Sequence, residues 1–208
     1  MVATPGLISN NNNNSFPLPN LFGDSKSANF VDPSTGAIYI GGEFDRTIIT
    51  DVIPEIDKIL AGSTNLAPNL KRLTFNINSV GGEVPQLSAL LTTIDFARQN
   101  GFQIATYVLG QACSCASMLA MYGDKGLRFI GRTSSHLVHH FSHGCVISTR
   151  EEIERTYANH KGMDEIIKQL YLSNTKLSSK QYDEFVSCDW KTLYAKDCVK
   201  YGLADHII

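Results

Sequence analysis

Short apolar segments alternate with amphipathic segments from Ala37 onward, and this alternation limits the fold more than any other feature of the chain. Ile38-Tyr39-Ile40 is typical of a buried strand, and apolar residues at helical spacing follow it from Ile48 to Leu60. The same order recurs further along the chain. We expect strands near 38–40, 73–77, 104–109, 128–130 and 136–140, and helices near 48–60, 87–97, 114–122, 149–172 and 195–201. A shorter helix is expected to begin at Ser178. Repeated strand–helix units predict an α/β fold with a mostly parallel sheet.

The length and charge of the chain exclude several classes of protein. Its 208 residues suit one domain, and the 43% hydrophobic content supplies a core. A formal net charge of −2 gives no basic excess for a phosphate backbone, so we expect no nucleic-acid partner. No apolar run approaches the roughly 18 residues of a membrane span, and five cysteines show no disulfide spacing. We therefore predict a cytoplasmic protein with no membrane association.

The first 36 residues differ in composition from the rest. Asn10 to Asn14 form a polyasparagine run, and Ser, Pro and Asn continue to Gly36. Such a segment buries too little apolar surface to offset its ordering entropy. We predict a flexible arm over 1–36 and one folded domain over 37–208.

Two junctions between a strand and a helix carry the chemistry. Asn78-Ser79-Val80-Gly81-Gly82 frees the backbone to turn and to present N–H groups. Gly110 to Ser117 places two hydroxyls and two thiols at the start of a helix, where the dipole favours a nucleophile. The candidates for that nucleophile are Ser114, Ser117, Cys113 and Cys115.

A cluster of histidines supplies a base. Strand alternation places His136 and His140 on one face and His139 on the other, so the cluster is divided. That division, and the lack of a CxxC or HExxH motif, argue against a tetrahedral metal site, so we predict no metal and no cofactor. A solvated polar patch is the ordinary explanation for His136, His140 and His143.

The order of these motifs resembles the ClpP family, the serine peptidase chamber of the Clp protease. The resemblance rests on five segments in sequence order and extends from about Ile38 to Ile208. The segments are 77–82, 110–114, Arg128-Phe129, His139 and Tyr201-Gly202-Leu203-Ala204-Asp205. It implies the crotonase-like fold and a serine endopeptidase that hydrolyses peptide bonds inside an oligomeric chamber.

The resemblance also assigns roles to residues. It implies Ser114 as the nucleophile, His139 as the general base, and the amides of Gly82 and Cys115 as the oxyanion hole. The orienting aspartate of the triad falls on Asp189 if one residue is inserted before Tyr201, and Asp183 and Glu184 are the alternatives for this role. These roles suit serine chemistry, in which a neutral imidazole takes the hydroxyl proton and backbone donors face the developing oxyanion.

The resemblance further implies stacked heptameric rings, a tetradecamer, in which the helix at 149–172 protrudes between the rings. An AAA+ unfoldase would supply unfolded protein substrates, and peptides would enter unaided. Two alternatives stay open: a catalytically inactive scaffold subunit, and a crotonase-type acyl-CoA enzyme with Glu83 as its acid–base group. The sequence departs from the family pattern at Val80, at Glu83 and in the arm. These departures indicate a divergent member of the family, and a phage-encoded protein is one such possibility.

Overall fold

Parallel strands form the centre of the molecule, as the strand–helix alternation predicts. The computed structural model describes residues 28–63, 71–140, 150–187 and 190–208. Five strands lie side by side and parallel, and one more pairs antiparallel at the edge. In spatial order they are β1 (Asn29–Asp32, antiparallel), β2 (Ala37–Ile40), β3 (Arg72–Ser79), β4 (Gln103–Cys113), β5 (Arg128–Ile130) and β8 (His206–Ile207).

The sheet divides at β4, which is long enough to pair with two strands in succession. Its first part, Thr106 to Val108, pairs with β5, and its last part, Gln111 to Cys113, pairs with β6 (Ser135–His139). β7 (Trp190–Tyr194) then pairs antiparallel with β6. The divided sheet brings the end of β4 next to the end of β6, where two of the predicted site residues lie.

Gly110 was predicted to end its strand, and this prediction is wrong. β4 continues through Gly110 to Cys113. A Cβ at Gly110 would meet the Asn78 side chain, whose Oδ1 accepts a hydrogen bond from the Gln111 amide at 3.1 Å. The glycine therefore serves the close approach of β3 and β4, where the register between Ile77 and Ser79 is irregular.

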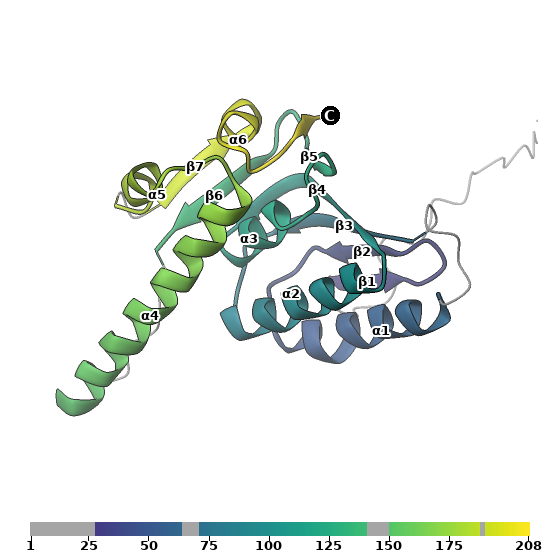
Figure 1. The fold of residues 1–208 in the computed structure, drawn as a ribbon, viewed down its shortest axis with the longest axis horizontal. Coiled ribbons are helices and arrows are strands. Elements are labelled where there is room, and N and C mark those ends of the chain that lie inside the picture. Colours follow the sequence, from purple (N-terminus) through teal and green to yellow (C-terminus); the bar gives the residue numbers. More distant parts are fainter. Residues whose placement is uncertain (1–27, 64–70, 141–149, 188–189) are drawn as a thin grey trace, which may run out of the picture.

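Helices cover the sheet at the predicted positions (Figure 1). The π-helical turn η1 leads into α1, which begins with Pro54 in its first turn, where proline is tolerated. α1 and α2 lie next to each other, whereas α4 projects beyond the rest of the fold. The helices are η1 (Ile48–Val52), α1 (Ile53–Gly62), α2 (Val84–Gln99), α3 (Cys115–Met121), α4 (Arg150–Asn174), α5 (Ser179–Val186) and α6 (Ala195–Tyr201).

The sequence predicts capping boxes at Thr149 and Ser178 and a left-handed helix end at Gly202, and the structure confirms the two that it describes. Ser178 and Gln181 form a reciprocal capping box at the start of α5. Gly202 ends α6 in the left-handed region with φ 77°. The capping box predicted at Thr149 lies outside the described residues.

The sheet begins before residue 37. β1 falls within the range 1–36 predicted as an arm, and it pairs with β2 from Asn29 to Asp32. Residues 1–27 lie outside the described part of the chain. None of the helices in that described part is long and apolar enough to span a bilayer.

A buried ion pair joins β5 to the C-terminal segment. Arg128 is only 2% exposed, and its guanidinium contacts Asp205 at 2.5 Å and the Asn174 carbonyl oxygen at 2.7 Å. Burial acts to raise the pKa of Asp205, but the hydrogen bonds and charge of Arg128 outweigh it and lower that pKa. A carboxyl group whose pKa is lower in the native protein than in the unfolded chain stabilises the fold fully at pH values above the pKa of the unfolded chain. This contribution of Asp205 is lost as the pH falls through the pKa of the native state, in the acidic range.

Removing the carboxylate should leave a buried, unpaired guanidinium. We expect Asp205→Asn to lower the free energy of unfolding by about 3 kcal/mol, measured by urea denaturation at neutral pH. Asp183→Asn is the matched control, because the Lys168–Asp183 pair is largely exposed on the carboxylate side. It should cost less than about 1 kcal/mol, and equal losses in the two variants would contradict the prediction.

Candidate active site

Ser114 occupies a sharp turn between β4 and α3. Its φ of 54° and ψ of −122° make it the only non-glycine residue with positive φ among those described. Its amide donates a hydrogen bond to the Leu137 carbonyl oxygen at 3.0 Å, which ties the turn to β6. A strained strand-to-helix turn that presents a serine is the geometry of a nucleophile elbow.

A small pocket brings Ser114 and His139 together. Its volume is about 60 Å³, and Gly82 also lines it, so three predicted site residues from three separate segments share one cavity. Within the described residues no hydrogen bond joins Ser114 Oγ to His139, which is common in a site without substrate. The remaining lining residues are Val84, Met118, His140, Ile167 and Tyr171.

Two backbone hydrogen bonds hold the loop after β3 against Phe44. The Gly81 carbonyl oxygen accepts from the Phe44 amide at 2.8 Å, and the Glu83 amide donates to the Phe44 carbonyl oxygen at 2.8 Å. The Gly81 amide donates to Ser79 Oγ at 3.1 Å. The amide of Gly82 has no acceptor among the described residues. It is therefore available to a ligand in the Ser114 pocket.

Glycine is required at two positions of this loop, because Gly81 packs on the serine turn and Gly82 packs on the Phe44 backbone. A Cβ at Gly81 would lie 2.7 Å from Ser114 Cβ and 2.6 Å from the Cys113 carbonyl oxygen. A Cβ at Gly82 would lie 2.6 Å from the Phe44 amide nitrogen. The φ values of 96° and 147° also exclude most other residues.

Cys115 is the first residue of α3, so its amide has no acceptor inside that helix. Its buried thiol donates a hydrogen bond to the Gly82 carbonyl oxygen at 3.1 Å. Burial raises the pKa of the Cys115 thiol to about 11 and also raises that of Cys113. Because the thiolate is the reactive form, burial makes both cysteines weaker candidates for the nucleophile.

A second serine–histidine pair lies beneath the pocket. Ser117 Oγ is 2.9 Å from His136 Nδ1, and the Tyr171 hydroxyl donates to Ser117 Oγ at 3.2 Å. All three side chains are buried, so no substrate reaches Ser117, which leaves Ser114 as the accessible serine. The trio links α3, β6 and α4.

His136 was predicted to belong to a solvated patch, and this prediction is wrong. Its side chain is fully buried, and burial, with the nearby charge of Arg128, lowers its pKa to about 3. His140 is exposed, and His143 lies outside the described residues. Among the described side chains, no three His, Cys, Asp or Glu groups converge in the way that a metal site requires.

Asp189 lies outside the described residues. Its neighbour in the chain, Trp190, begins β7, and its backbone pairs with His139. Glu83 is exposed, is bonded to the Gln86 side chain and does not line the Ser114 pocket, as expected for a carboxylate that faces solvent.

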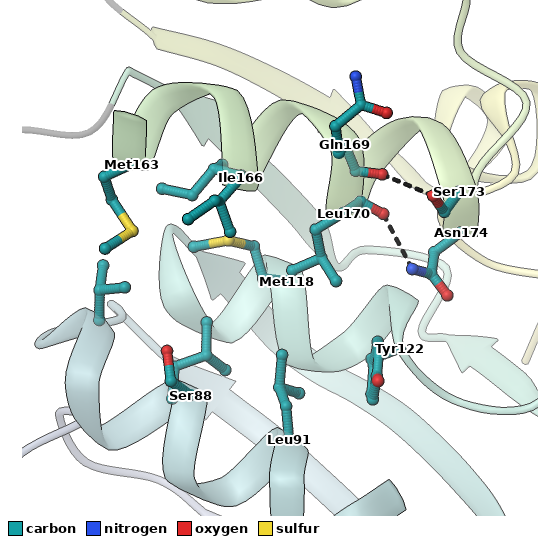
Figure 2. Close-up of a pocket in the computed structure, with 13 residues that line it drawn as sticks. Ser88, Leu91, Met118, Tyr122, Met163, Ile166, Gln169, Leu170, Ser173 and Asn174 are labelled. Carbon is teal, nitrogen blue, oxygen red and sulfur yellow. Dashed lines mark hydrogen bonds between the residues drawn. The ribbon is translucent and has the colours of Figure 1, made fainter. Parts of the chain in front are cut away.

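The helical wall of the site was not predicted. An apolar groove of about 400 Å³ between α2, α3 and α4 adjoins the Ser114 pocket and shares Val84, Met118 and Ile167 with it. Figure 2 shows Met118 of α3 between the side chains of α4, such as Ile166, and those of α2. Helical periodicity indicated that these residues are apolar, but nothing in the sequence indicated which helices face one another.

An elbow serine and a histidine on one pocket, beside a glycine loop, are typical of serine hydrolases. The Clp protease family model matches residues 33–208, so the chain belongs to the Clp protease family and has its crotonase-like fold. It is 28% identical over 170 residues to ATP-dependent Clp protease proteolytic subunit 1 of Corynebacterium diphtheriae. It is 26% identical over 170 residues to proteolytic subunit 2 of Corynebacterium jeikeium. Each alignment covers 82% of this chain and 77% of the relative.

Burial of a neutral His136 makes the stability depend on pH. With a native pKa lowered to about 3, the unfolded chain binds a proton between pH 6.5 and 3 that the native state does not. Stability is therefore complete above about pH 6.5 and falls as the pH is lowered. We expect the wild type to lose about 2 kcal/mol more than His136→Asn between about pH 7.5 and about pH 5, by urea denaturation. Equal losses of unfolding free energy in the wild type and in His136→Asn would show that His136 does not cause this pH dependence.

Proposed function

We propose that this chain is a serine endopeptidase subunit of a Clp-type protease. The observation that supports it most is the shared pocket of Ser114, His139 and Gly82, whose amide has no acceptor in the described structure. Membership of the Clp protease family is consistent with this chemistry.

In the proposed mechanism, His139 removes the proton of Ser114 as Oγ attacks the carbonyl carbon of the scissile peptide. The Gly82 and Cys115 amides donate to the oxyanion of the tetrahedral intermediate, and each donor contributes about 3 to 4 kcal/mol. His139 then protonates the leaving amine, and the acyl-enzyme forms. A water molecule, activated by the same imidazole, releases the acyl group and restores the serine.

Asp189 completes the proposed triad by orienting His139. The pairing of His139 with Trp190 supports this role, because Trp190 directly follows Asp189 in the chain. No specific observation supports either alternative function. The exposed position of Glu83 argues in particular against a crotonase-type acyl-CoA enzyme, in which Glu83 would be the acid–base group.

We propose further that the subunit acts in stacked heptameric rings with an AAA+ unfoldase as partner. The projecting α4 supports an assembly, since Ile166 on this helix is 64% exposed. The relatives are ATP-dependent Clp protease proteolytic subunits, which supports an ATPase as the partner. Peptides would be cleaved without the partner and folded proteins only with it.

The first test is covalent labelling of the serine. We expect one fluorophosphonate adduct on the wild type, detected by intact mass, and none on Ser114→Ala. Ser117→Ala is the matched control, because this serine is buried, and it should keep the adduct. An unlabelled wild type that is folded and oligomeric would overturn the proposed peptidase function.

A second test concerns the triad. Asp189→Asn should lower kcat for a short peptide by up to about 10⁴, because the imidazole loses its orienting partner. Asp183→Asn removes a nearby carboxylate that is bonded to Lys168 instead, and it should leave kcat unchanged. If Asp189→Asn keeps the kcat of the wild type, another residue must orient His139.

A further inference from the structure

The oxyanion loop, residues 79–83, meets the start of α3 through a single side-chain hydrogen bond among the described contacts. Cys115 Sγ donates to the Gly82 carbonyl oxygen at 3.1 Å, across 33 residues of sequence. The other hydrogen bonds of the Gly81, Gly82 and Glu83 backbone groups in the described structure go to Phe44 and Ser79, and the Glu83 carbonyl oxygen accepts from the Leu87 amide of α2. The thiol therefore adds a hydrogen bond across the contact at which Gly81 packs on the Ser114 turn.

The geometry of the two peptide units around Gly82 explains why that link matters. In the first unit, a planar trans peptide places the Gly81 carbonyl opposite the Gly82 N–H, so the Phe44 bond to the carbonyl leaves the Gly82 N–H facing away from the Phe44 amide. In the second unit, Phe44 holds the Glu83 amide on one side, and Cys115 holds the Gly82 carbonyl on the other. Without the thiol, the second unit is held from one side only.

The thiol has the properties of a permanent donor rather than of a reactive group. It is fully buried, and its pKa, raised by burial to about 11, keeps it protonated at neutral pH. The same residue carries the second proposed oxyanion amide at the start of α3. One residue thus sets the separation of the two donors, through its backbone on one side and its side chain on the other.

We propose that Cys115 is a positioning residue of the oxyanion hole, acting through the Gly82 peptide. The inference rests on the proposed peptidase function. It predicts a loss of rate at constant substrate affinity when the S–H donor is removed, because the donors act on the transition state more than on the bound peptide.

The experiment compares Cys115→Ala, Cys115→Val and Cys115→Ser by fluorophosphonate labelling rate and by kcat and KM for a short fluorogenic peptide. Alanine and valine both remove the donor, and valine keeps most of the volume, so each should lower the labelling rate and kcat about tenfold with KM unchanged. Serine restores a donor, and it should recover the rate to within about threefold of the wild type.

Cys198→Ala is the matched control. Cys198 is also fully buried, and its thiol also donates to a carbonyl oxygen, that of Leu193 at 3.2 Å, but it lies in α6. It should lower the thermal midpoint about as much as Cys115→Ala does while leaving kcat unchanged. If Cys115→Ala does not fold, the comparison of valine with serine decides the question.

Two results would overturn the inference alone: a labelled wild type with unchanged rates in alanine and valine variants, or equal losses in serine and valine variants. The second result would mean that side-chain shape, and not the donor, is what matters. A wild type that takes no label would overturn the proposed function and the inference with it.

Discussion

The contact between the Gly81–Gly82 loop and the Ser114 turn is the constraint on which the rest of the site depends. The Cys113 carbonyl and the Ser114 methylene approach Gly81 so closely that no Cβ fits there, and the Phe44 backbone excludes a Cβ at Gly82. The contact exists because β3 and β4 are parallel neighbours, so their carboxyl ends release the loop and the turn at one edge of the sheet. Division of the sheet at β4 then adds the end of β6, with His139, to the same edge.

The sequence was informative where the signal was local. Paired glycines, the Ser178 capping box and Gly202 act within a few residues, and the structure has each in the expected conformation. Gly110 was wrongly predicted to end its strand, because its role is a contact with Asn78, 32 positions earlier in the chain. A prediction from neighbouring residues alone cannot detect such a contact. β7 was missed because its pairing with β6 depends on segments far apart in sequence.

Within the site, alternation along β6 correctly divided His136 from His139, but it could not say which face the helices cover. Tyr171 and Ser117 lie over the His136 face, so that imidazole is buried and neutral. Two serine–histidine pairs therefore lie within a few residues of each other and differ in access to substrate. The pair with the hydrogen bond in the described structure is the one that a substrate cannot reach, so burial is the better guide to function here.

The apolar groove and the Ser114 pocket are separate cavities with common walls, since Val84, Met118 and Ile167 line both. A substitution at any of these three positions alters two volumes at once. At these positions the two cavities cannot be reshaped independently. A change that reshapes the groove and leaves the pocket unaltered must fall on a residue that lines the groove alone, such as Leu91 or Ser173.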